Sequence, residues 1–357
     1  MRVVIFTGQS GLDRKPYLTE LEKIAEAGGH RFKVFHVGDI MYSLNPALQR
    51  GRILDLPLGE LNALLMACFE RIRREMVAYD SIGVSMHATF RWKRGLIGGT
   101  DYSLIEPLRP DVFVTLIDDV SDVFARLNEE YPEKGYTYKD VMVWREEEIL
   151  TTSIFAALSK NDRFVFARKH PARTLYKLLF QPKKLRLYVS FPITAVIDKP
   201  DIVAEIGNFK DELVKHFTVF DPYTISEKRL DYLAKAAKKA GKSSIEYLVG
   251  GRKTNIELAD LLPILPDIDD QIIARDLILV EQSGAIIAFY PCLENGTPVH
   301  SAGREREVQH ARDTAKPVYL IWPSTVHEPG PFEVDAATKI FRSVPEAQDF
   351  LLRTYAA

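Results

Sequence analysis

A short segment near the start of the chain combines glycines and cations at the spacing of a phosphate-binding loop. Residues 8–15 read GQSGLDRK and follow the apolar run of residues 3–6. Backbone N–H groups of such a loop, together with the N-terminus of the helix that follows, attract and bind an anionic phosphate. Gly8 and Gly11 would allow the turn. On pattern alone, a tight turn that needs two glycines explains the segment equally well.

The loop departs from the P-loop pattern G-x-x-x-x-G-K-[ST] at its last three positions. Asp13 stands in the place of the second glycine, Arg14 in that of the lysine, and Lys15 in that of the magnesium-binding hydroxyl. Arg14 keeps a cation that can bind phosphate, and Lys15 can assist it. The lost hydroxyl argues against ordinary hydrolysis of Mg-ATP. We therefore expect this loop to bind ATP or another nucleotide, and we leave its need for magnesium open.

Three segments of the C-terminal half place hydroxyl and carboxyl side chains beside strand-like runs. Residues 187–194 (LYVSFPIT) end one such run, and residues 273–277 (IARDL) lie on a predicted helix before a later run. Residues 301–307 (SAGRERE) begin the helix after that later run. Since parallel sheets bind ligands at the carboxyl ends of their strands, the three segments can meet in one site.

Strand-like and helix-like segments alternate along the chain, which predicts an α/β fold of parallel sheets covered by helices on both faces. In the N-terminal half we predict strands at residues 3–6, 32–37, 81–86, 112–117 and 164–167, and helices from residue 16 to the glycines at 28–29, and at 61–76, 121–127 and 139–158. In the C-terminal half we predict strands at residues 185–190, 218–220, 285–290 and 318–322, and helices at 200–216, 268–283, 304–314 and 343–355, with a helix-rich, basic region at 226–264.

A chain of 357 residues is too long for one ordinary core and predicts two domains. The apolar pattern breaks at residues 181–184 (QPKK) and then starts again in the same style. We therefore place the boundary near residue 183, which gives domains of residues 1–183 and 184–357.

Most of residues 1–180 resemble the nucleoside- and nucleotide-kinase branch of P-loop proteins, an adenylate-kinase-like group, with a degenerate loop. The resemblance depends on the loop, on residues 87–92 (HATFRW) and on residues 109–119 (RPDVFVTLIDD). It implies that the end of the third strand faces the nucleotide, where these side chains would lie: His87, Thr89 and Arg91.

The fourth predicted strand ends in an acidic pair, Asp118 and Asp119. Such a pair could hold a metal ion, but an acidic strand end is as often the N-cap of the next helix. We assign no metal site.

The three C-terminal segments together, over roughly residues 184–325, resemble the nucleoside 2-deoxyribosyltransferases and their hydrolytic relatives, the 2'-deoxynucleoside 5'-phosphate N-hydrolases. The resemblance implies a flavodoxin- or Rossmann-like three-layer domain that often completes its site from a neighbouring subunit, so we expect a homo-oligomer. It implies Glu307 as nucleophile, Asp276 as acid and base, and Tyr188 as the group that orients the nucleophile. The substrate-binding residues implied are Ser301, Gly303, Arg304, Ile193 and Thr194.

The chemistry of that family explains these residue types. Breaking an N-glycosidic bond develops positive charge at C1' of the sugar, which a carboxylate can stabilise or trap covalently. The departing base needs a proton from a second acid. A tyrosine hydroxyl can fix the nucleophile and tune its pKa. Such cleavage requires no cofactor. Singly, each residue is explained about as well by a solvated helix charge or a core tyrosine.

Ser301 at a predicted helix start favours a nucleoside 5'-monophosphate, because free N–H groups there attract phosphate and a carboxylate would repel it. His300 and Arg304 could add positive charge. Departures from the family put the substrate in question: Phe191 replaces a small residue, Thr194 replaces a phosphate-binding arginine, Gly284 replaces an acidic residue, and the loop of residues 291–300 is long.

Composition excludes several classes of protein. The net charge of -2, from 47 Lys plus Arg and 49 Asp plus Glu, argues against a nucleic-acid binder that relies on bulk positive charge. The basic residues 228–242 are explained by a solvated helix face, with nucleic-acid binding as the minority alternative. Two cysteines, Cys68 and Cys292, form no CxxC pair, which favours a reducing cytoplasm over a disulfide framework or a thiolate zinc site. The N-terminus lacks a signal-peptide layout, and no apolar run has membrane-spanning length.

These observations leave three hypotheses. The first is an enzyme that cleaves, or transfers at, the N-glycosidic bond of a nucleoside 5'-monophosphate or nucleoside, with a nucleotide-binding N-terminal domain. The second is a nucleotide-sensing regulatory or defence protein without turnover. The third is a nucleotide kinase with an accessory C-terminal domain. The sequence leaves open the base, the sugar, and whether water or a second base accepts the glycosyl group.

Overall fold

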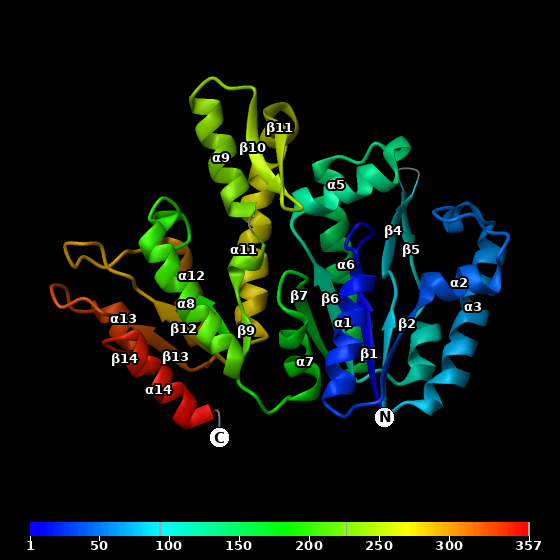
Figure 1. Ribbon diagram of the computed structural model, residues 1–357, viewed down its shortest axis with the longest axis horizontal. Coiled ribbons are helices and arrows are strands. Elements are labelled where there is room, and N and C mark those ends of the chain that lie inside the picture. The colour runs from blue at the N-terminus through cyan, green and yellow to red at the C-terminus, as the bar shows by residue number, and fades with distance from the viewer. Residues whose placement is uncertain (93–94, 226, 356–357) are drawn as a thin grey trace. The chain divides into compact units, whose positions relative to one another are not determined.

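Two five-stranded sheets, each with all its strand pairs parallel, organise the chain (Figure 1). The computed structural model describes residues 1–92, 95–225 and 227–355, apart from the side chain of Trp92. One sheet lies in a unit of residues Met1–Arg168 and the other in a unit of residues Lys169–Ala357, called here the first and second units. The α/β class and the two parallel sheets predicted from the alternating pattern are therefore confirmed. Within the described residues, every helix is too short or too polar to cross a membrane.

The sheet of the first unit has the strand order β2-β3-β1-β6-β7. Its central strand is buried along nearly its whole length, as expected of a strand covered on both faces. In register, Phe6 of this strand pairs with Ser85 and Thr7 pairs with Thr115, so β3 ends one residue before β1 and β6 ends two residues after it. The strands are β1 (Arg2–Thr7), β2 (Phe32–His36), β3 (Ser81–Ser85), β6 (Val112–Ile117) and β7 (Asp162–Ala167).

Six α-helices of the first unit cover this sheet or lie at its edge: α1 (Arg14–Ala27), α2 (Val37–Leu44), α3 (Leu58–Glu75), α4 (Tyr102–Ile105), α5 (Val120–Glu130) and α6 (Tyr138–Ser159). Single 3₁₀ turns are η1 (Ile53–Asp55), η2 (Met76–Ala78), η3 (Glu106–Leu108) and η4 (Pro132–Lys134). The sequence analysis did not predict α2, nor the antiparallel hairpin of β4 (Thr89–Trp92) and β5 (Gly95–Gly98) that directly follows β3. Both were missed because their runs are only four to eight residues long, too short to show a clear period.

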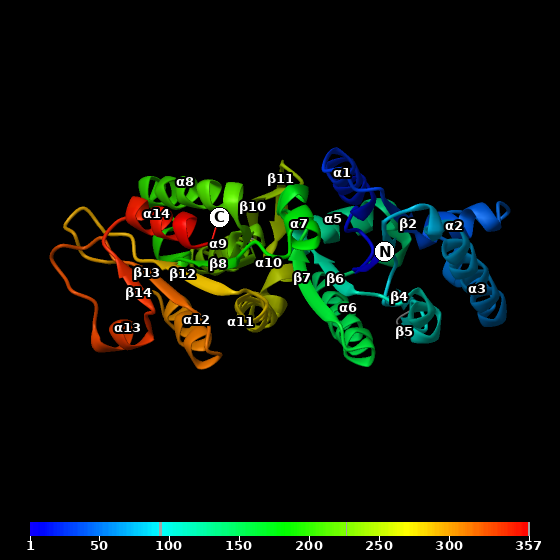
Figure 2. The same cartoon turned by 90° about the horizontal axis from the view of Figure 1, so that it is seen from below.

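The sheet of the second unit has the strand order β14-β13-β12-β8-β9. Its strands are β8 (Arg186–Ser190), β9 (Thr218–Phe220), β12 (Ala285–Phe289), β13 (Val318–Ile321) and β14 (Lys339–Phe341). Figure 2 shows α8 (Pro200–His216) and α14 (Val344–Tyr355) on one face, and α11 (Leu265–Glu281) and α12 (Ala302–Asp313) on the other. The remaining elements are α7 (Ala172–Phe180), η5 (Thr194–Val196), η6 (Pro222–Thr224), α9 (Glu227–Lys239), α10 (Leu258–Leu261), η7 (Leu262–Ile264) and α13 (Pro331–Ala336).

The region of residues 226–264, predicted to be helix-rich, also contains in its described part, residues 227–264, a hairpin of β10 (Ser244–Val249) and β11 (Arg252–Glu257). Gly250 and Gly251 form its turn with φ of 57° and 81°, values that suit the turn of a tight hairpin. On α9, Lys228 and Lys235 pair with Asp231 and Asp269, so acidic neighbours balance part of the basic stretch.

The units divide between residues 168 and 169, earlier than the boundary predicted near residue 183. The reason is α7, which was not recognised as part of the second unit. Lys177 of this helix donates hydrogen bonds from its Nζ to the backbone oxygens of Val214 and, at 2.9 Å, of Lys215. These contacts join α7 to the end of α8, although a break in the apolar pattern follows α7.

Candidate functional site

The loop of residues 8–15 has backbone dihedrals that fit its glycines. Gly8 has φ of 144° and Gly11 φ of 77°, and a Cβ atom on Gly8 would lie 2.7 Å from the carbonyl oxygen of Leu116. Asp13, in the place of the second glycine of a P-loop, is also left-handed, with φ of 51° and ψ of 48°. Aspartate tolerates this region better than most residues, so the substitution preserves the turn into α1.

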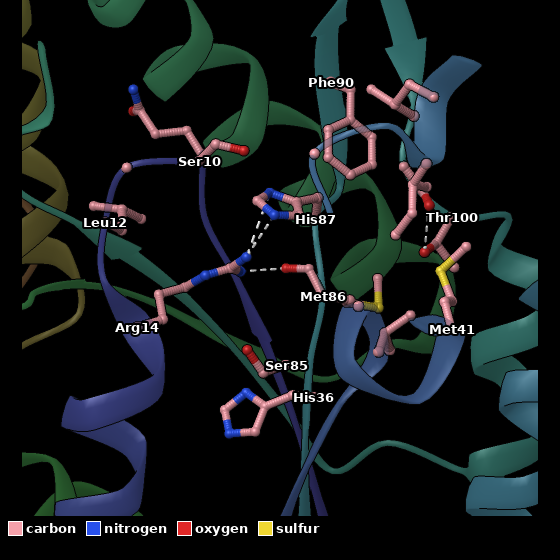
Figure 3. Close-up of a pocket in the computed structure, with 18 of the residues that line it drawn as sticks. Ser10, Leu12, Arg14, His36, Met41, Ser85, Met86, His87, Phe90 and Thr100 are labelled. Carbon is pink, nitrogen blue, oxygen red and sulfur yellow. Dashed lines mark hydrogen bonds between the residues drawn. The ribbon is translucent and has the colours of Figure 1, made fainter. Parts of the chain in front are cut away.

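Arg14 extends from the start of α1 towards the end of β3, as Figure 3 shows. Its guanidinium donates to the backbone oxygen of Met86, and its Nη2 lies 2.8 Å from Nε2 of His87. Burial lowers the pKa of Arg14 to about 10, which leaves it charged at neutral pH. Burial, and then the positive charge of Arg14, lower the pKa of His87. Neutral His87 can therefore accept a hydrogen bond from Arg14.

The residues on either side of Arg14 form ion pairs. Nζ of Lys15 lies 2.6 Å from a carboxylate oxygen of Asp39, and both side chains are exposed. Asp13 lies 2.8 Å from Nη2 of Arg168. Both pairs are at the surface and contribute little to stability, but they set the local charge around the loop.

A buried glutamate that the sequence analysis missed holds the loop against the end of β3. Glu148 of α6 accepts hydrogen bonds from the backbone N–H groups of Gly8 (3.0 Å), Ala88 (3.0 Å) and Thr89 (3.1 Å). Only 1% of its surface is exposed. The sequence signal was a glutamate within the buried stripe of α6, between Trp144 and Thr152.

Two residues predicted to face a nucleotide have different surroundings. Thr89 is buried, outside the cavity described below, and its backbone groups bind Glu148 and the indole N–H of Trp144. Arg91 lines the cavity and forms a bidentate pair with Glu147, at 2.8 and 2.5 Å. Arg91 therefore lines the same cavity as the loop, whereas Thr89 does not line it.

The loop borders a cavity of about 370 Å³. Figure 3 shows Arg14, His36, Met86 and His87 around it, with Phe90 on the hairpin side. Apolar side chains from α2, η1 and α3 form another wall: Met41, Ile53, Leu54, Leu61 and Leu65. The cavity thus joins a cationic end to an apolar surface.

The acidic strand end forms a cluster with a third carboxylate. Oxygens of Asp118, Asp119 and Asp122 lie within 4.8 Å of one another. Asp118 is 2.5 Å from Nη2 of Arg126 and 3.7 Å from Nη1 of Arg168. These two guanidinium groups balance its charge.

In the second unit the structure brings Tyr188 and Glu307 together. The hydroxyl of Tyr188 donates to Oε1 of Glu307 at 2.8 Å, and the hydroxyl of Ser190 donates to Oε2. Tyr188 and Ser190 are two residues apart on β8, so they share one face of the strand. The sequence analysis did not select Ser190. The two-residue period of a strand, counted from Tyr188, was the signal that could have found it.

The surroundings of Glu307 disfavour the ionised form of its carboxyl group. Burial, and then the neighbouring carboxylate Asp276, raise its pKa to about 8, although hydrogen bonds from Ser190 and Tyr188 oppose the shift. Burial also raises the pKa of Asp276. These two acids therefore retain protons at higher pH than exposed carboxyl groups do.

A buried ion-pair chain supports Asp276. Nε of Arg275 lies 3.3 Å from Asp276, and Nη1 of Arg275 lies 3.5 Å from Glu227. Glu227, at the start of α9, has no exposed surface. Neither Arg275 nor Glu227 was selected from the sequence, because their pairing depends on the packing of α9 against α11.

The predicted substrate-binding residues divide into accessible and buried groups. Ser301 is the N-cap of α12 and makes no capping hydrogen bond with its side chain. Gly303 and Thr194 are exposed, and Ile193 is half-buried. Arg304, expected to add positive charge for a phosphate, is instead 1% exposed, and its Nη1 donates to the backbone oxygens of Phe289 and Val299 at 3.2 and 2.8 Å.

Comparisons with known proteins concern the N-terminal half. Adenylate kinase from Saccharolobus solfataricus is 26% identical over 155 residues, which is 41% of this chain and 78% of that protein. Adenylate kinase from Saccharolobus islandicus strain M.14.25 matches with the same identity and coverage. Shikimate kinase from Bacteroides thetaiotaomicron covers 50% of this chain and 98% of its own, with 11% identity and a TM-score of 0.35, a level that supports no further statement. No family model matches the sequence.

The N-terminal half is therefore similar to P-loop nucleotide kinases, as predicted. These relatives give no support to the resemblance of residues 184–325 to the nucleoside 2-deoxyribosyltransferases, which stays a prediction.

Replacing Glu148 with glutamine should destabilise the protein by about 1–3 kcal/mol, because the amide N–H₂ would face backbone N–H donors. Chemical denaturation monitored by fluorescence measures the change. The matched control is Glu147→Gln, which alters a partly exposed pair and should cost less than about 1 kcal/mol. Equal losses in the two variants would contradict the role of Glu148.

Glu307 should titrate near pH 8, which carboxyl-carbon NMR of the labelled protein can measure. Asp276→Asn should lower that pKa, because it removes a negative charge beside Glu307. Glu305→Gln, on the exposed side of the same helix, should leave it unchanged. An unchanged titration in Asp276→Asn would show that burial alone causes the shift.

Proposed function

We propose that the first unit binds a nucleotide in the cavity beside residues 8–15. The observation that carries this proposal is the 26% identity to adenylate kinase over 155 residues. The position of the cavity supports it, since open parallel sheets bind ligands at the carboxyl ends of their strands.

The proposed binding mode divides the ligand between the two parts of the cavity. Backbone N–H groups at the start of α1 and the guanidinium of Arg14 receive the phosphates. The apolar wall, which includes Met41 and Leu65, gives the base a surface to pack against. His87 orients Arg14, and Arg91 adds a second cation at the edge.

Phosphoryl transfer should be slow or absent, since Lys15 replaces the hydroxyl that holds magnesium in working P-loops. The protein should bind ADP or ATP with little ATP hydrolysis. Arg14→Ala should weaken binding by about ten-fold or more, the loss of a charge-assisted hydrogen bond. Isothermal titration calorimetry measures the affinity.

The matched control is Lys23→Ala, which removes an exposed cation of the same helix and should leave affinity unchanged. Robust magnesium-dependent ATPase activity that Arg14→Ala abolishes would contradict slow turnover and favour a working kinase.

A second candidate function belongs to the second unit: cleavage of, or transfer at, the N-glycosidic bond of a nucleoside 5'-monophosphate or nucleoside. The specific observation in its favour is the pair of hydroxyl groups, from Tyr188 and Ser190, that hold the two oxygens of Glu307. The strand order of this unit, that of flavodoxin-like sheets, places β8 and β12 at the switch point where such folds bind ligands.

In this mechanism ionised Glu307 attacks C1' of the sugar. A bond forms between a carboxylate oxygen and C1', the N-glycosidic bond breaks, and the base leaves with a proton from Asp276. Water, or a second base, then attacks C1' and gives its proton to ionised Asp276, while the bond between C1' and Glu307 breaks and releases the carboxylate. Since only ionised Glu307 is a nucleophile and only protonated Asp276 can give the base a proton, turnover should rise with pH towards about 8 and fall at higher pH, where Asp276 is ionised.

Glu307→Gln should abolish base release, because the amide keeps the shape of the side chain and loses its charge. Chromatography of nucleosides and 5'-monophosphates after incubation measures the release. Unaltered turnover in this variant would exclude Glu307 as nucleophile.

Ser301→Asp provides the comparison for substrate choice. It should retain turnover but lose the expected preference for a monophosphate, since a carboxylate beside the start of α12 repels the phosphate. Nucleotide binding without turnover in either unit would instead favour the regulatory or sensing hypothesis. Assembly into a homo-oligomer also stays a proposal.

A further inference from the structure

We infer that the first unit binds its nucleotide without a magnesium ion, with cationic side chains taking the place of the metal. The inference rests on the nucleotide binding proposed above. P-loop proteins hold Mg²⁺ between the nucleotide phosphates, a loop hydroxyl and a carboxylate at the end of a nearby strand. In this chain, neither of those protein positions fits a metal ion.

The position of the loop hydroxyl carries a cation. Lys15 stands there, and a protonated amine has three donors and no acceptor for a metal ion. Its Nζ lies 2.6 Å from Asp39, so it also engages a carboxylate of the cavity wall. A divalent ion at this place would be repelled by Lys15.

At the strand ends on both sides of β1, guanidinium groups already engage one described side chain each. On the β3 side, Ser85, Met86 and His87 line the cavity, and Nε2 of His87 lies 2.8 Å from Nη2 of Arg14. On the β6 side, Asp118 is paired with Arg126 and lies 3.7 Å from Arg168. Mg²⁺ requires oxygen ligands in near-octahedral geometry. His87 offers a ring nitrogen that faces Arg14, and the carboxylate of Asp118 is paired with arginine.

The carboxylates that line the cavity also have partners. Asp13 pairs with Arg168, and Asp39 pairs with Lys15. Glu130 accepts a hydrogen bond from the hydroxyl of Tyr131 at 2.8 Å. Since a metal would have to displace these partners, the donor set disagrees with the metal that the P-loop pattern implies.

Charge favours the metal-free ligand. A nucleotide without Mg²⁺ carries two more negative charges than its magnesium complex, and the buried guanidinium of Arg14 attracts it more strongly. Lys15 and Arg91 also line the cavity, and a phosphate there would compete with their carboxylate partners, Asp39 and Glu147. Magnesium should therefore leave affinity unchanged or lower it.

The test is calorimetric titration of the full-length protein with ADP and with ATP, in EDTA and in excess MgCl₂ at matched ionic strength. We expect affinity in EDTA to equal or exceed that in MgCl₂. Ten-fold or greater tightening by MgCl₂ would overturn the inference and leave the proposed nucleotide binding intact. No binding of either nucleotide in either buffer would overturn both.

Two substitutions at one position separate the charge from the missing hydroxyl. Lys15→Thr restores the hydroxyl of a working P-loop, so MgCl₂ should tighten its nucleotide binding several-fold. Lys15→Met has neither group and should bind several-fold more weakly than the unmodified protein in EDTA, without a response to MgCl₂. Unchanged affinity of Lys15→Met in EDTA would show that Lys15 does not replace the metal, and would count against the inference.

Discussion

Parallel strands end at the same edge of a sheet, and both candidate sites follow from that constraint. At this edge the backbone N–H groups of the turns that follow the strands form no hydrogen bonds within the sheet, so side chains or ligands must accept hydrogen bonds from them. In the first unit the register of β1 with β3 and β6 brings three strand ends close together. In the second unit two hydroxyls of β8 contact Glu307 of α12.

The two units satisfy buried carboxylates at this edge in different ways. Glu148 receives backbone N–H groups from two strand ends, so its charge serves to fix the loop to the β3–β4 connection. Glu307 receives two side-chain hydroxyls and faces another acid, Asp276, which keeps its pKa high. In the first arrangement both carboxylate oxygens of Glu148 are used to hold backbone N–H groups. The second holds a carboxyl group whose protonation changes near neutral pH.

Two cations occupy the loop positions where the P-loop pattern has a lysine and a hydroxyl residue. Asp13 keeps the left-handed conformation of a glycine, while its carboxylate pairs with Arg168. Arg14 reaches across to β3 and uses its donors on Met86 and His87. Similarity to adenylate kinase therefore coexists with a loop that keeps a cation for the proposed phosphate binding and lacks the hydroxyl that would hold magnesium.

The sequence by itself determined the α/β class, the two parallel sheets and the positions of most strands, because short apolar runs alternate with helix-like segments, a pattern typical of parallel sheets covered by helices. It also indicated the loop, and it selected Tyr188 and Glu307 as members of one group. Only the tertiary structure decided which polar groups meet: Glu148 with the backbone N–H of Gly8, Ser190 with Glu307, Arg275 with Glu227, and Nη1 of Arg304 with two backbone oxygens. Gly8 and Glu148 are 140 residues apart in the chain, and Ser190 and Glu307 are 117 apart. Local periodicity reports which face of an element is buried, but the partner of a buried polar group depends on how distant elements pack, and that information is not contained in any one segment.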